Sequence, residues 1–116
     1  MTGAAAHRRI DLCAADEVAP GTVKLCEVGD ELVLVTNLGG TFHAAQGICS
    51  HEYFELDRGV MAGDTIMCML HLSRFSLIDG EVIDPPAEMP LAVYPVVVDG
   101  GRVLIEIPEG PLAVNR

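Results

Sequence analysis

This chain of 116 residues contains no tryptophan, and its only other aromatic rings belong to three Phe and two Tyr. Basic residues are also few: seven Lys and Arg stand against seventeen Asp and Glu, which gives a formal net charge of −10. The shortage of positive charge argues against nucleic-acid binding, because neutralising phosphates requires a basic surface. The shortage of aromatic rings leaves Val, Leu, Ile and Ala to form the core.

Long apolar runs are missing as well. The longest, from Leu91 to Val98, has eight residues and contains Pro95, so it is too short to cross a bilayer. The first residues place their arginines after small residues and show no apolar stretch typical of an export signal. We therefore expect a cytoplasmic protein without a membrane partner. Half of the residues are apolar, and the length predicts a single domain over residues 1–116.

Turns that contain glycine divide the chain into short apolar runs, at 29–30, 39–40, 79–80 and 99–101. No window has the sustained apolar spacing of a long helix, and only a short helical turn near Asp11–Ala19 is favoured. The sequence therefore predicts an all-β fold, an antiparallel sandwich or barrel. The predicted strands are Val23–Val28, Leu32–Thr36, Thr41–Ala45, Phe75–Ile78, Val82–Ile83, Val93–Val98 and Arg102–Ile107.

Residues 46–74 interrupt this succession of hairpins. They carry two short pairs of metal-binding residue types, Cys49-Ser50-His51 and Cys68-Met69-Leu70-His71. We interpret 46–74 as a subdomain specialised to hold a metal, inserted into a base made of 1–45 and 75–116. The segment 84–90 contains three prolines, which lack a backbone donor, so it is predicted to be a loop.

Each pair joins one thiolate donor to one imidazole donor at a spacing that a single tight loop can present. Two sulfur and two nitrogen ligands suit a [2Fe–2S] centre in which two histidines replace two cysteines on one iron. Zinc binds the same donors, so a structural Cys2His2 zinc module is an alternative. Four cysteines in a cytoplasmic protein favour metal chemistry over disulfides.

The remaining candidate ligands lack a partner at ligand spacing. Cys13 and Cys26 are predicted to be small buried side chains, and His7 and His43 to have surface or packing roles. The acidic residues after the first pair, Glu52, Glu55 and Asp57, form either a docking feature or a solvated face. No catalytic triad, phosphate-binding loop or dinucleotide-binding glycine pattern is present. Catalysis by the chain alone is therefore not expected.

The two pairs, their order and the surrounding hairpins resemble the Rieske family over about Thr22 to Glu106. The similarity is greatest to the small ferredoxins of bacterial aromatic-ring-hydroxylating dioxygenases. The segment 47–51 is similar to the first ligand loop, and 68–71, followed by Phe75 and Asp79-Gly80, is similar to the second. The resemblance implies the Rieske fold and one [2Fe–2S] cluster held by Cys49, His51, Cys68 and His71.

The same resemblance implies an electron carrier between a flavin-containing reductase and a terminal ring-hydroxylating dioxygenase in aromatic compound degradation. It would be a monomer by default, with transient partner contacts. The cysteines would be buried and the histidines exposed, within a docking rim of Glu52, Tyr53, Leu70, Leu72 and Pro85. The alternative of the same fold is the small subunit of a nitrite reductase, which often lacks the ligands that this chain retains.

Several residues depart from the family pattern. Met69 replaces the usual proline of the second motif, and Leu72 replaces a frequent glycine. The loops lack the extra cysteines of high-potential Rieske proteins, and Phe75 replaces a tyrosine whose hydroxyl faces the cluster there, although Ser73 matches the family's serine. We therefore predict a low potential. Pro85-Pro86 would belong to the family's proline loop near the cluster.

Overall fold

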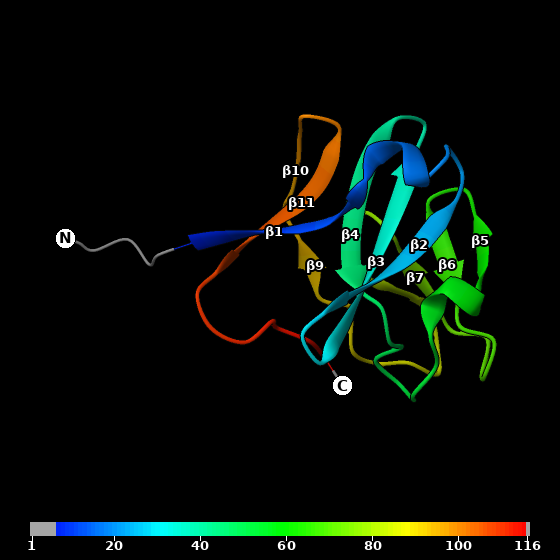
Figure 1. Cartoon of the computed structure of the whole chain (residues 1–116). Coiled ribbons are helices and arrows are strands. Elements are labelled where there is room, and N and C mark those ends of the chain that lie inside the picture. The colour runs from blue at the N-terminus through cyan, green and yellow to red at the C-terminus, as the bar shows by residue number, and fades with distance from the viewer. Residues whose placement is uncertain (1–6, 116) are drawn as a thin grey trace.

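The computed structural model describes residues 7–115 and contains three antiparallel sheets (Figure 1). The first has the order β1 (His7–Ala14), β11 (Arg102–Pro108), β10 (Val96–Asp99). The second has the order β2 (Val23–Val28), β3 (Glu31–Leu38), β4 (Thr41–Gln46), β9 (Val93–Tyr94). The third follows chain order, with β5 (Val60–Ala62), β6 (Thr65–Met67), β7 (Arg74–Ser76), β8 (Val82–Asp84).

The all-β prediction is confirmed. Among the described residues the helical elements are two 3₁₀ turns, η1 (Ala15–Glu17) and η2 (Leu56–Arg58). None of the described segments forms a helix long and apolar enough to span a membrane. The hairpin β2–β3–β4 follows the glycine turns as predicted. The predicted strand Val93–Val98 is divided at Pro95, and its two halves belong to different sheets.

The first strand was not predicted. The expected helical turn near Asp11–Ala19 is wrong for residues 11–14, which continue β1, and only η1 is helical. His7, for which a surface or packing role was predicted, is the exposed first residue of this strand. Antiparallel pairing with β11 along its whole length determines this outcome, and exposed ion pairs join Arg9 to Glu106 at 3.0 Å and Arg102 to Asp11 at 2.8 Å across the two strands. Long-range pairing here overrides a weak local preference.

Buried apolar side chains connect the second sheet to the third. Leu34 and Ala45 of the second sheet share one core cluster with Ile66 and Phe75 of the third. All four side chains are almost completely buried. Such close packing fixes the position of the loops that leave both sheets. The ends of β4 and β6, from which the predicted metal-binding loops start, therefore rest on one common core.

Candidate metal centre

The four predicted ligands lie on two loops, residues 47–55 after β4 and residues 68–73 between β6 and β7. Each loop closes on itself soon after its cysteine. The Cys49 N–H donates to the Phe54 carbonyl at 3.0 Å, and the Cys68 N–H donates to the Ser73 carbonyl at 2.8 Å. The histidine of each pair therefore lies within a tight turn.

Gly47 determines how the first loop leaves β4. A Cβ atom at this position would lie 2.5 Å from the Leu25 side chain and 3.0 Å from the Leu32 backbone. The Gly47 N–H also donates to the Leu32 carbonyl at 2.7 Å. Only glycine permits this close approach. The first loop is thereby held against the β2–β3 hairpin.

Gln46, which the sequence reasoning did not single out, is the buried anchor of the same loop. Its Nε2 donates to the carbonyls of Ile48 and Asn115, at 2.8 and 2.7 Å. Its Oε1 accepts from the N–H groups of Ala92 and Asn115, at 2.7 and 2.8 Å. The amide thus has partners on both of its atoms, as a buried polar group requires. Its position at the end of an apolar strand was the only available sequence signal.

The two predicted cysteine ligands form the inner part of the site. Cys49 and Cys68 are 3 % and 2 % exposed and belong to the core cluster between the second and third sheets. Burial raises the pKa of the Cys68 thiol to about 11, although the backbone N–H groups of Leu70 and His71 oppose the shift. A metal would therefore displace a proton on binding, and these N–H groups would stabilise the resulting thiolate.

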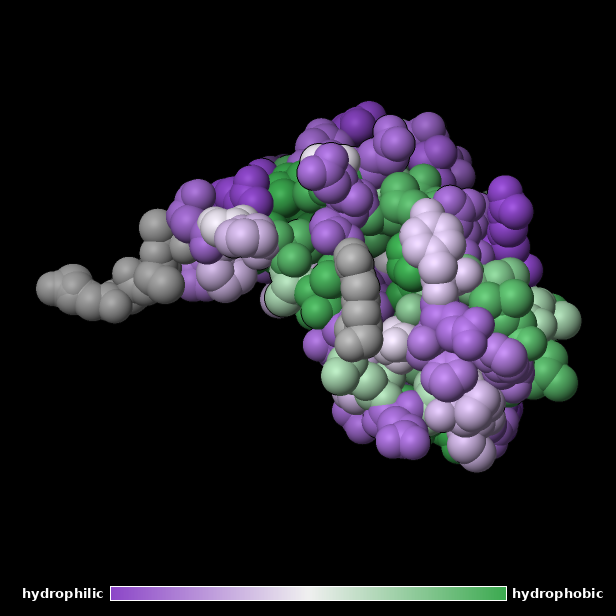
Figure 2. All heavy atoms as spheres, turned by 90° about the horizontal axis from the view of Figure 1, so that it is seen from below, coloured by the Kyte–Doolittle hydropathy of each residue, from purple (hydrophilic) through white to green (hydrophobic). Residues whose placement is uncertain are grey.

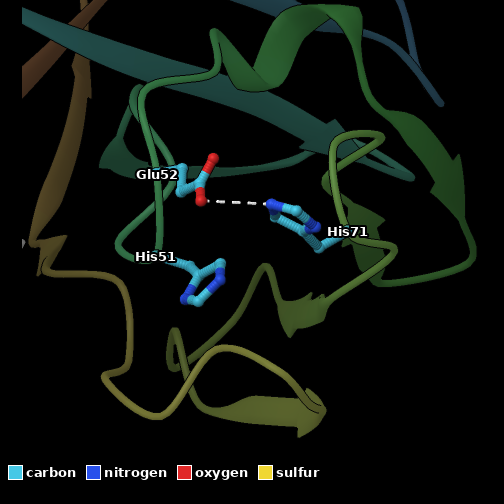
Figure 3. A group of neighbouring side chains, drawn as sticks. All are labelled: His51, Glu52 and His71. Carbon is cyan, nitrogen blue, oxygen red and sulfur yellow. Dashed lines mark ion pairs between the residues drawn. The ribbon is translucent and has the colours of Figure 1, made fainter.

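The two predicted histidine ligands form the outer part. The His51 and His71 rings are exposed and meet edge to face, with centroids 5.2 Å apart and an interplanar angle of 82°. Glu52 joins them, because its Oε1 lies 3.2 Å from Nε2 of His71 (Figure 3). The donor atoms of these three residues all lie within 4.8 Å of one another. Glu52, for which a docking or solvated role was predicted, is about half exposed, and its carboxylate also faces a predicted ligand.

The cysteine donors are buried, whereas the histidine donors are exposed. Within residues 7–115, neither cysteine joins a group of three donors that all lie within 4.8 Å of one another. A single tetrahedral zinc ion would require its four donor atoms to lie within about 3.8 Å of one another. A buried thiol pair beside an exposed imidazole pair instead suits a centre with two metal ions, each held by one pair.

The proline-rich loop at 84–90 contacts both ligand loops. The Ser50 hydroxyl donates to the Met89 carbonyl, which ties the first loop to it. The Ala87 N–H donates to the Ser73 hydroxyl oxygen at 2.9 Å, which ties the second. Ala87 also packs in the core cluster that contains both cysteines. The hydroxyl proton of Ser73 remains available for a further acceptor.

Leu72 adopts the backbone conformation for which glycine is suited. Its φ is 64°, and its N–H donates to the Cys68 carbonyl at 2.8 Å, closing the turn that contains His71. A left-handed conformation costs a non-glycine residue about 1–2 kcal/mol. The side chain is 55 % exposed. The loop therefore keeps its shape without glycine, at a cost in stability.

Phe75 lies beside the predicted cysteine ligands, whereas the remaining cysteines and histidines named in the sequence analysis lie in other parts of the fold. Phe75 is fully buried in the core cluster of Cys49 and Cys68 and brings no hydroxyl group there. Cys13 and Cys26 are buried as predicted, in a separate cluster with Val18, Val35 and Val103. His43 lies within β4 and His7 at the start of β1.

Exposed apolar side chains surround the two histidines in sequence. Tyr53 is 72 % exposed, and Met69, Leu70 and Leu72 are each about half exposed. The view of the molecule from below shows apolar side chains interspersed with polar ones instead of one continuous apolar face (Figure 2). Such a mixed surface is typical of transient contacts rather than of permanent interfaces.

Residues 8–95 match the family model of the Rieske [2Fe-2S] domain, and the chain belongs to this family. The "Biphenyl 2,3-dioxygenase, ferredoxin component" of Rhodococcus jostii (strain RHA1) is 35 % identical over 99 residues, which cover 85 % of this chain and 92 % of the relative. The "Alkene monooxygenase system, ferredoxin component" of Xanthobacter autotrophicus (strain ATCC BAA-1158 / Py2) is 38 % identical over 97 residues, covering 83 % and 79 %.

Solved structures confirm the fold. A chain of the "Complex of reduced oxygenase and oxidized ferredoxin in carbazole 1,9a- dioxygenase" superposes with a TM-score of 0.79 at 31 % identity, covering 90 % of this chain and 97 % of that one. A putative NADH-dependent nitrite reductase small subunit from Mycobacterium tuberculosis reaches 0.75 at 24 % identity, covering 94 % and 99 %. The second likeness concerns the fold alone.

Proposed function

We propose that this chain is a Rieske ferredoxin that carries single electrons to the terminal oxygenase of a multicomponent system, and is not itself an enzyme. The observation that carries the proposal is the pair of buried thiols beside a pair of exposed imidazoles, on two loops fixed to one core. Relatives named as ferredoxin components at 35 % and 38 % identity support it. An aromatic-ring-hydroxylating dioxygenase is the proposed partner.

The proposed ligands are Cys49 and Cys68 for the inner iron and His51 and His71 for the outer one, within a cluster-binding subdomain of residues 46–74. A [2Fe–2S] cluster, when bound, takes up and releases one electron. The burial of Cys49 and Cys68 keeps water away from their sulfur atoms. The exposed histidine rings offer a short path between the centre and a docked partner.

The surroundings of the thiols support a low potential. Leu70 and His71 supply backbone N–H groups toward Cys68, and the Ser73 hydroxyl lies on the same loop. Phe75 adds no donor, although it is buried in the same core cluster. Fewer hydrogen bonds to sulfur leave the reduced centre less stabilised. A flavin-containing reductase would be able to reduce such a centre.

The exposed apolar residues Tyr53, Leu70 and Leu72 are proposed as the contact surface for both partners. A net charge of −10 would steer the encounter with basic patches on them, and added salt would slow association. We propose that the protein acts as a monomer in the cytoplasm. Its contacts with both partners would be transient, since a carrier must release each partner before it binds the next.

The test is anaerobic purification followed by metal and sulfide analysis, electron paramagnetic resonance and stopped-flow mixing. We expect a brown protein with two irons and two labile sulfides, reduced by a flavin reductase and reoxidised by a ring-hydroxylating oxygenase. A colourless protein with one zinc ion would overturn the proposal and establish the zinc module.

The second candidate partner is the oxygenase of an alkene monooxygenase system, because one relative serves such a system at 38 % identity. Mixing the reduced protein with both oxygenases distinguishes the two. Faster reoxidation by the monooxygenase would assign the chain to that class.

A further inference from the structure

Glu52 connects the two ligand loops from the outside. It follows His51 directly in sequence, yet its carboxylate reaches His71 on the other loop, with Oε1 3.2 Å from Nε2 (Figure 3). Among the ion pairs of the described residues, this is the one that includes a histidine. About half of each side chain is exposed, so solvent weakens but does not remove the interaction.

The contact favours one tautomer of the neutral His71 ring. A neutral imidazole has one N–H donor and one nitrogen with a free lone pair. A carboxylate acceptor at Nε2 holds the proton there, which leaves Nδ1 free to bind a metal. The edge-to-face contact with His51 restricts the same ring from a second side. Both contacts orient His71 before any metal arrives.

The carboxylate also brings a negative charge next to a ligand of the outer iron. Adding an electron to a nearby centre is then less favourable, because like charges repel. His51 has no ion pair among residues 7–115, but its donor atom also lies within 4.8 Å of the Glu52 carboxylate, so the negative charge acts on both predicted histidine ligands.

We propose that Glu52 is a positioning residue that orients His71 for Nδ1 ligation and lowers the reduction potential of the centre. This inference rests on the proposed function, since it requires a cluster held by His71. It assigns to one carboxylate two separable effects, one of hydrogen bonding and one of charge.

The experiment compares Glu52→Gln, Glu52→Ala and the control Glu55→Gln in the purified, cluster-containing protein. Glu52→Gln removes the charge but keeps an amide oxygen that can accept from Nε2, whereas Glu52→Ala removes both. Glu55→Gln removes the same charge from the same loop, but that carboxylate pairs with Arg58 at 3.7 Å. The measurements are the midpoint potential by voltammetry and the half-life of the visible absorption of the cluster.

We expect Glu52→Gln to raise the equilibrium constant for one-electron reduction by about fivefold to tenfold, up to about 59 mV in potential. The control should move the potential by less than half of that shift. Glu52→Ala should raise the potential at least as far and lose its cluster several-fold faster than the wild type, whereas Glu52→Gln should keep it. Equal shifts for Glu52→Gln and Glu55→Gln, or no shift, would overturn the charge effect. A wild-type half-life for Glu52→Ala would overturn the positioning effect.

These outcomes are distinct from failure of the proposed function. If the wild type holds no [2Fe–2S] cluster, the proposed function itself is wrong. If the wild type and all variants hold the cluster with one common potential, the proposed function stands and only the role of Glu52 is lost.

Discussion

The chain contains two pairs of buried cysteines that have much in common. Cys13 and Cys26 belong to one buried core cluster, and Cys49 and Cys68 belong to another. Burial raises the pKa of Cys26 to about 12 and that of Cys68 to about 11. In each pair the two side chains come from separate elements of the chain.

The pairs differ in what surrounds the sulfur atoms. Cys13 and Cys26 lie on β1 and β2, within a cluster of aliphatic side chains. Cys68 begins a loop whose backbone N–H groups point to its sulfur, and an exposed histidine follows each cysteine of its pair. Two neighbouring buried thiols are therefore not sufficient for a metal site. The loop after Cys68 adds backbone N–H donors and a histidine at ligand spacing, which the strands that carry Cys13 and Cys26 do not provide.

The largest expected effect is the loss of the cluster when one proposed ligand is removed. Cys49→Ala or His71→Ala should abolish the cluster, because each removes one of the four proposed ligands. Cys13→Ala should keep the cluster at full occupancy and lose about 1 kcal/mol of unfolding free energy through a small cavity. Iron and sulfide analysis of the purified variants measures the difference. Equal cluster loss in Cys13→Ala would show that the Cys13 and Cys26 pair takes part in ligation.

Alkaline pH should destabilise the fold through the buried pair Cys13 and Cys26. The pKa of Cys26 rises from 9.0 to about 12 on folding, so between these values the unfolded thiol loses its proton while the folded one keeps it. The unfolded state then binds fewer protons, and stability is fully present below pH 9 and falls as pH rises toward 12, by about 1.4 kcal/mol per pH unit for this thiol.

Cys26→Ser, which does not ionise in this range, is the matched variant. Urea unfolding at pH 8 and pH 10.5 should show a shallower loss of stability in Cys26→Ser than in the wild type. Parallel losses in the two proteins would contradict the assigned pKa of Cys26.

A smaller effect concerns the backbone of the second ligand loop. Leu72→Gly should stabilise the protein by about 1 kcal/mol, because glycine adopts the positive φ of 64° without steric cost. The same change removes an exposed apolar side chain from the proposed contact surface, so reoxidation by the oxygenase should slow several-fold. Thermal unfolding and stopped-flow mixing measure the two effects. Reduced stability would indicate that Leu72 packs in a way that offsets its strain.

The smallest expected change is in the potential of the centre. Phe75→Tyr places a hydroxyl donor in the core cluster that contains both proposed cysteine ligands, and should raise the midpoint potential by tens of millivolts, about 1 kcal/mol or less. Voltammetry of the variant beside the wild type tests this. A lowered potential would mean that the hydroxyl does not donate to sulfur.

The sequence predicted the parts of the fold that depend on local signals. Glycine turns located the hairpins of β2 to β4, and the Cys and His spacing selected the two loops that the structure brings together. The strand β1 was missed because its partner β11 lies at the other end of the chain. The strands β5 and β6 were missed because residues 46–74 were interpreted as an insertion that interrupts the hairpins, and no strand was predicted within it.

Positioning residues were harder to find than ligands for the same reason. Gln46 acts through Asn115, 69 residues away, and Glu52 acts through His71 on another loop. Neither partner lies at a spacing that a motif describes. Their roles follow from tertiary contacts, which a single sequence does not contain.

The hydrogen bonds of Asn115 have a practical consequence for electrochemistry. Its backbone pairs with Gln46, and its side chain donates to the Pro90 carbonyl at 3.0 Å, so the C-terminal segment lies beside both the first ligand loop and the proline-rich loop. The strand β1 projects away from this end (Figure 1). A protein attached to an electrode through a residue beside Asn115 would hold the two ligand loops toward the conducting surface, whereas attachment through β1 would turn these loops outward for a partner in solution.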